Sequence, residues 1–106
     1  MTRLLVAAEA EGDIDDILDY LEREAGRATA AAYAERFAAE IQRIADFPGH
    51  ATSGPALGGE TRVGLVYPYL LIYDYSAADE EATLLRVLHG KRDITEQLIR
   101  RKPKPR

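Results

Sequence analysis

The stretch from Ala82 to Ile94 reads Ala-Thr-Leu-Leu-Arg-Val-Leu-His-Gly-Lys-Arg-Asp-Ile, and the rest of the chain can be organised around it. Its first part is typical of a β-strand, in which successive side chains point to opposite faces of a sheet. This alternation predicts that one face carries Leu84, Arg86 and Leu88 and that the other carries Leu85, Val87 and His89.

Gly90 interrupts the apolar run and ends this strand, and a charged turn follows it. Asp93 is a residue type that caps helices, so we predict a short final helix from Ile94 to about Ile99. The end of the strand therefore carries a cluster of polar groups, which are Arg86, His89, Lys91 and Arg92.

Arg86 is unusual because burying an unpaired charge inside an apolar strand is costly. We expect its side chain on a face of the sheet that opens to water or to a partner. A second interpretation pairs Arg86 with an acidic residue such as Asp74 across the sheet, and Arg62 has the same alternative. A second interpretation of His89 is a core histidine with a satisfied hydrogen bond, because it alternates with apolar residues.

Length and composition indicate a single domain. The 106 residues are enough for one hydrophobic core, which we place in residues 1–99, with residues 100–106 as a basic flexible tail. The chain has no cysteine and no apolar run near the roughly 20 residues of a membrane span. The N-terminus lacks the pattern of a signal peptide, so we expect a cytoplasmic protein without membrane contact.

The charge is distributed unevenly along the chain. Residues 1–46 carry 11 acidic and 5 basic side chains, whereas residues 86–106 carry 8 basic and 2 acidic ones. The formal net charge is -4, which argues against broad affinity for nucleic acid, since that requires a basic face. The pattern suits a partner that contacts one end of the domain.

Two amphipathic helices are predicted in the first half of the chain. The first runs from Glu9 to Gly26 with its acidic residues, Asp13 among them, on a solvated face; its apolar stripe is Ile14, Ile17, Leu18 and Leu21. The second spans residues 28–46, with a stripe of Tyr33, Phe37, Ile41 and Ile44. The short link between them predicts an antiparallel hairpin.

The remaining elements are strands. Residues 3–7 form a first short strand, and residues 61–66, 69–75 and 82–89 form an antiparallel meander. We therefore predict an α+β fold in the order βααβββα, in which a small antiparallel-type sheet packs an α-helical hairpin on one face and a short C-terminal helix follows. The other face should be partly bare, and exposed apolar surface usually marks an interaction site.

The glycine-rich segment of residues 47–60 is interpreted as a connecting loop. Its spacing matches no nucleotide-binding motif, and no lysine follows its glycines. We expect no cofactor, no metal site and no small-molecule substrate.

The chain resembles the ParE/RelE superfamily of toxins from type II toxin–antitoxin modules, and it is closer to the ParE branch. The likeness covers residues 3 to about 99. It rests on the acidic run from Asp13 to Leu21, the end of the second helix at Phe47-Pro48-Gly49, the strand residue Arg62, and the closing segment from Leu85 to Ile94. The resemblance implies a cognate, ParD-like antitoxin, whose amphipathic helix we expect in a groove of this domain.

The resemblance leaves the target open. RelE-like members are ribosome-dependent mRNA endoribonucleases, and here the catalytic candidates for that reaction are Arg62, Arg86, His89 and Arg92, with His50 as a second histidine. However, residues 47–60 contain no lysine or arginine, and no tyrosine follows Asp93, so no confident catalytic set emerges.

ParE-like members inhibit DNA gyrase by protein–protein contact, and we favour this activity, which is not enzymatic. The family associates it with the C-terminal region, so the predicted target-binding residues are Arg86, His89, Lys91 and Arg92. A third possibility is an antitoxin-binding module of the same fold without toxicity.

Overall fold

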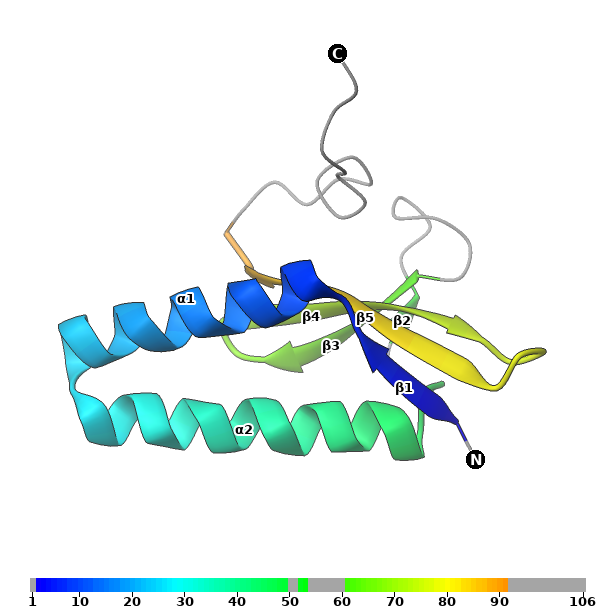
Figure 1. Ribbon diagram of the computed structural model, residues 1–106, viewed down its shortest axis with the longest axis horizontal. Coiled ribbons are helices and arrows are strands. Elements are labelled where there is room, and N and C mark those ends of the chain that lie inside the picture. Colours follow the sequence, from blue (N-terminus) through cyan, green and yellow to red (C-terminus); the bar gives the residue numbers. More distant parts are fainter. Residues whose placement is uncertain (1, 50–51, 54–60, 92–106) are drawn as a thin grey trace, which may run out of the picture.

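The computed structural model describes residues 2–49, 52–53 and 61–91. It contains two layers, a sheet and a pair of helices (Figure 1). The elements are β1 (Arg3–Val6), α1 (Ala8–Ala25), α2 (Arg27–Asp46), β2 (Thr52–Ser53), β3 (Thr61–Val66), β4 (Tyr69–Ser76) and β5 (Glu81–His89). The predicted α+β class is confirmed, whereas the predicted final helix and basic tail lie outside the described residues.

The five strands form one sheet in the order β1-β5-β4-β3-β2. The predicted meander of β3, β4 and β5 is confirmed, and β1 adds to it as a parallel neighbour of β5. A parallel pair needs a long crossover, and the helical hairpin between β1 and the rest of the sheet supplies it. The predicted loop of residues 47–60 is wrong at Thr52 and Ser53, because these form β2 and pair with β3.

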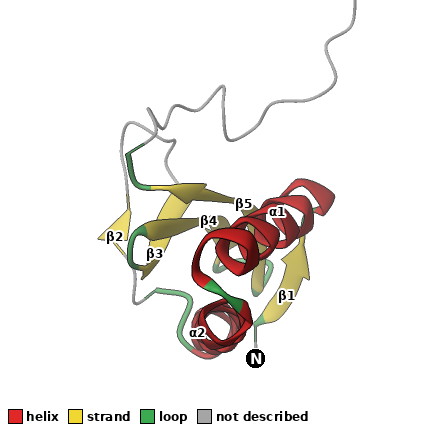
Figure 2. Ribbon diagram, turned by 90° about the vertical axis from the view of Figure 1, so that its left-hand side faces the viewer, coloured by secondary structure: helices red, strands yellow, loops and turns green. Residues whose placement is uncertain are grey.

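Both helices pack on the same face of the sheet, with their axes side by side (Figure 2). Gly26 connects them alone, with a φ of 99° that side-chain-bearing residues rarely adopt. The predicted stripes are confirmed except at Leu21, which is not part of the core cluster. Their other residues pack together around the strands: Ile14, Ile17, Leu18, Tyr33, Phe37, Ile41 and Ile44 from the helices, with Leu71, Tyr73, Leu84 and Val87 from the sheet. No helix in the described part of the chain is long and apolar enough to span a membrane.

The opposite face of the sheet carries a smaller apolar cluster. Ile72 and Leu88 lie at its centre, with 0% and 3% of their surfaces exposed, and Val63, Leu70 and Leu85 pack around them. This face was predicted to be partly bare: Ile72 and Leu88 belong to its covered part, and Val63, Leu70 and Leu85 are only partly buried.

A β-bulge in β5 changes which residues face the helices. Tyr73 pairs with Leu84, but the next residue back along β4, Ile72, pairs with Arg86, so Leu85 is an extra residue. A bulge of this kind moves all later side chains to the other face relative to simple alternation. The predicted alternation along β5 is consequently wrong, since Leu84 and Val87 both belong to the helix-facing cluster.

Candidate functional site

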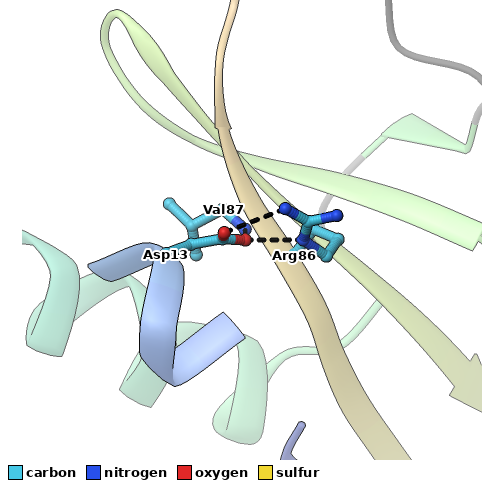
Figure 3. A network of polar contacts seen from close by, with 3 residues as sticks. All are labelled: Asp13, Arg86 and Val87. Atoms are coloured by element: carbon cyan, nitrogen blue, oxygen red, sulfur yellow. Dashed lines mark hydrogen bonds and ion pairs between the residues drawn. The ribbon is translucent and has the colours of Figure 1, made fainter. Parts of the chain in front are cut away.

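Arg86 is buried and forms a two-pronged ion pair with Asp13 of α1 (Figure 3). Its Nε donates to Oδ2 of Asp13 over 2.7 Å, and its Nη2 donates to Oδ1 over 2.9 Å. Only 7% of Arg86 is exposed. The expectation that its side chain opens to water is therefore wrong, and so is the solvated position predicted for Asp13.

Asp13 also completes the edge of β5. Strand β1 pairs with β5 only as far as Leu84, and the backbone N–H of Val87 donates instead to Oδ2 of Asp13 over 2.9 Å. The Asp13 carboxylate thus bonds both a buried guanidinium and a backbone N–H that β1 does not reach. The hydrogen bonds from the Arg86 guanidinium to Asp13 raise the pKa of Arg86 above its ordinary value, at which the group is already charged at physiological pH.

His89 ends β5 beside an aromatic cluster that connects it to α2. It lies opposite Tyr69 on β4, and the two rings meet edge to face with centroids 5.5 Å apart. Tyr69 in turn contacts Phe37 and Tyr33 of α2, at centroid distances of 5.7 Å and 5.9 Å. The half-buried imidazole is therefore held by packing against a rigid part of the core.

The turn after His89 is ordered by hydrogen bonds. The backbone N–H of Lys91 donates to Nδ1 of His89 over 3.0 Å, so the hydrogen of a neutral imidazole lies on Nε2. The N–H of Gly90 donates to the carbonyl of Pro68 over 2.7 Å, and a Cβ at Gly90 would lie 3.1 Å from that oxygen. This close approach places the exposed Lys91 directly beside His89.

The structure does not bring Arg62 to the same place. Arg62 pairs with Tyr73 and stacks over the Tyr75 ring at 6.0 Å, whereas His89 pairs with Tyr69. Tyr69 and Tyr73 are four residues apart on β4, which corresponds to about 13 Å along a strand. Of the predicted site residues, only His89 and Lys91 are adjacent at the surface, while Arg92 and His50 lie outside the described residues. Within the described ranges, no three acidic or histidine side chains are grouped to hold a metal.

A groove that the sequence did not indicate lies between α2 and the end of β3. It is an open surface hollow of about 250 Å³, lined by Arg36, Ala39, Glu40, Arg43, Leu65 and Val66. The available signal was the spacing of Arg36 and Arg43, which places two cations on one side of a helix two turns apart. Leu65 was not predicted to line a groove, because a leucine in a strand is ordinarily assigned to the core.

Burial raises the pKa of Tyr69, with a smaller contribution from neighbouring tyrosines. An unfolded chain therefore loses this proton at lower pH than the folded chain, so stability should fall as pH rises above about 10. We expect Tyr69→Phe to reduce that alkaline loss, measured as the change in urea midpoint between neutral and alkaline pH. Tyr67→Phe, at a 73% exposed tyrosine that does not contribute to the shift, is the control. An identical alkaline loss in both variants would contradict this prediction.

Two of the comparisons with known proteins found a match, one to a family model and one to a solved fold. The model described as "ParE toxin of type II toxin-antitoxin system, parDE" matches residues 4–94. A chain in the solved structure "Chromosomal ParDE TA system from P. aeruginosa" has a similar fold, with a TM-score of 0.72 at 16% sequence identity. The match covers 86% of this chain and 98% of that chain. No curated protein shows significant similarity.

Proposed function

Because this chain belongs to the ParE toxin family of type II toxin–antitoxin systems, we propose that it is a toxin that inhibits DNA gyrase by protein–protein contact. A cognate antitoxin neutralises it, and both partners act in the cytoplasm. The observation that carries the proposal is the family match over residues 4–94, which includes every strand and helix of the described fold except the first residue of β1.

The geometry supports binding over RNA cleavage. A metal-independent ribonuclease needs a base, an acid and a cation around one phosphate. Here Arg86 is turned into an ion pair with Asp13, and Arg62 lies about 13 Å along the sheet from the pairing position of His89. Among the described residues, His89 and Lys91 are the predicted site residues that lie together at the surface. This arrangement favours binding to gyrase over cleavage of RNA.

We assign the target contact to the end of β5, at His89 and Lys91, with Arg92 continuing the basic segment. Arg86 belongs to the same assignment as a positioning residue. Its pair with Asp13 fixes β5 against α1 and thereby fixes the direction in which the strand ends. A rigidly held histidine and an exposed lysine suit the capture of one conformational state of a protein partner.

The test is a supercoiling assay with purified gyrase, run in parallel with an assay of mRNA cleavage during translation. We expect the wild-type chain to inhibit supercoiling and to leave mRNA intact. His89→Ala/Lys91→Glu should require about tenfold more protein for the same inhibition, since a charge pair at a protein interface commonly contributes this much or more.

Arg23→Glu is the matched control, because Arg23 is an exposed cation in the last turn of α1, far along the chain from β5. It should inhibit as the wild type does. Cleavage of mRNA that Arg62→Ala abolishes would replace the gyrase proposal with the ribonuclease. Neither activity, together with tight antitoxin binding, would identify a module without toxicity.

A further inference from the structure

We infer that Tyr67, His89 and Lys91 form one surface, which binds a carboxylate side chain of the target protein. The inference rests on the proposed function, because that function supplies the target. It adds a third contact residue, Tyr67, and the chemistry of the group that the target presents. Tyr67 lies in the turn between β3 and β4, beside the end of β5 (see Figure 1 for these strands).

The turn that carries Tyr67 is held beside the end of β5 by backbone contacts. The N–H of Gly90 donates to the carbonyl of Pro68 over 2.7 Å. The next residue of the chain, Tyr69, pairs with His89 in the sheet. Tyr67 is 73% exposed, so these contacts place a large aromatic residue at the surface next to His89.

The neutral His89 ring offers a hydrogen-bond donor to a partner. Its Nδ1 accepts the backbone N–H of Lys91, which can only donate, so Nδ1 carries no hydrogen. The hydrogen of the neutral ring is then on Nε2, which makes no hydrogen bond within residues 2–49, 52–53 and 61–91. The exposed ammonium of Lys91 adds further donors and a positive charge close by. The matching group therefore accepts hydrogen bonds and is negatively charged.

A protein carboxylate fits this surface better than a phosphate of DNA, although both are anionic acceptors. Helix α1 lies beside β5, where Asp13 accepts the N–H of Val87. The exposed side chains of α1 include the carboxylates of Asp16 and Asp19, which repel a long polyanion. Tyr67 adds apolar area, and tyrosine is enriched at the centre of protein–protein contacts. We therefore expect an acidic residue with apolar neighbours on the target.

Two amide substitutions separate the donor of His89 from its contact with the turn. In His89→Gln an amide N–H replaces the Nε2 donor, whereas in His89→Asn the amide oxygen replaces Nδ1 and still accepts the N–H of Lys91. Half-maximal inhibition of supercoiling should require about tenfold more His89→Asn than wild type, but less than about threefold more His89→Gln. If His89→Gln inhibits no better than His89→Asn, the target does not contact the donor and the inference is overturned.

Tyr67→Ser should weaken inhibition about tenfold, as the loss of an aromatic residue at the centre of an interface commonly does. The matched control is Phe47→Ser, at an aromatic residue that is 65% exposed. Phe47 precedes Pro48, whose carbonyl accepts the hydroxyl of Tyr73, about 13 Å along β4 from Tyr69. Phe47→Ser should inhibit as the wild type does, and thermal unfolding checks that both variants are folded. Full inhibition by Tyr67→Ser would contradict the inference.

A carbodiimide cross-linker tests the chemical class of the bound group, because it joins a lysine amine to a carboxylate only where the two are in contact. The chain has three lysines, Lys91, Lys102 and Lys104. In the complex with gyrase, without DNA, mass spectrometry should find Lys91 joined to an aspartate or glutamate of gyrase. Lys91→Arg retains the charge but not the amine, so it should lose this cross-link and weaken inhibition less than about threefold.

The opposite results are equally clear. Cross-links at Lys102 or Lys104 without one at Lys91 would overturn the inference. So would binding of the wild-type chain to a duplex DNA oligonucleotide that Lys91→Met abolishes, since the surface would then bind nucleic acid. If the wild-type chain neither binds gyrase nor inhibits it, the proposed function fails as well. Inhibition by the wild type with any of the contrary results at His89, Tyr67 or Lys91 retains the proposed function and overturns only the inference.

Discussion

Replacing Asp13 with alanine is expected to lower the free energy of unfolding by about 3–5 kcal/mol, the range observed when one member of a buried ion pair is removed. Arg86 would remain buried without its carboxylate, with 9% of its side chain exposed. The N–H of Val87 would also lose its acceptor at the position where β1 no longer pairs with β5. Both consequences act on the contact between α1 and β5. Urea denaturation followed by far-UV circular dichroism measures the change.

The control for this prediction is Asp16→Ala. Asp16 is an exposed acidic residue on the same helix, and its removal should alter the free energy of unfolding by no more than about 0.5 kcal/mol. The double variant Asp13→Leu/Arg86→Met should regain the part of the loss that comes from the unpaired Arg86, because apolar pairs replace buried ion pairs with little cost, whereas the N–H of Val87 still lacks its acceptor. Equal effects of Asp13→Ala and Asp16→Ala would show that the ion pair contributes nothing.

Local patterns were sufficient to predict both helices and four of the strands, namely β1, β3, β4 and β5. The stripes of α1 and α2 repeat with helical spacing, and Gly26 and Pro48-Gly49 interrupt them, so both period and punctuation point to the same elements. In β4, Tyr69, Leu71 and Tyr73 alternate with Leu70 and Ile72, and the structure places the two sets in different clusters. Each of these signals is contained within a few neighbouring residues.

The features that escaped prediction depend on residues far apart in the chain. The bulge at Leu85 leaves no mark in an apolar run, because either register buries a leucine or a valine. The partner of Arg86 lies 73 residues away, and Asp13 looks like any other acidic residue of a solvated helix face. The choice between Asp13 and Asp74 as the partner of Arg86 was a question of tertiary packing.

The candidate site was predictable only in part, for the same reason. His89 and Lys91 are neighbours in sequence, so their proximity followed from the turn at Gly90. The groove brings together Arg43 of α2 and Leu65 of β3, which are separated by 22 positions and by a segment that contains β2. Only the packing of α2 against β3 makes a single surface of them.

Replacing Phe37 with alanine is the second substitution for which we expect a loss of about 3–5 kcal/mol in the free energy of unfolding, the usual range for a buried phenylalanine. Phe37 is 2% exposed and contacts the rings of both Tyr33 and Tyr69, with centroid distances of 6.3 Å and 5.7 Å. Its removal creates a cavity in the layer that supports Tyr69, and Tyr69 packs against His89. Chemical denaturation gives the stability, and near-UV circular dichroism reports the loosening of the tyrosines.

The chain provides its own control, since it contains only two phenylalanines. Phe47 follows α2 and is 65% exposed, so Phe47→Ala should cost less than about 1 kcal/mol. Phe37→Leu retains much of the apolar volume and should fall between the two alanine variants. If Phe37→Ala and Phe47→Ala destabilise equally, the aromatic cluster is not part of the core, and the argument that it holds His89 in a fixed orientation fails with it.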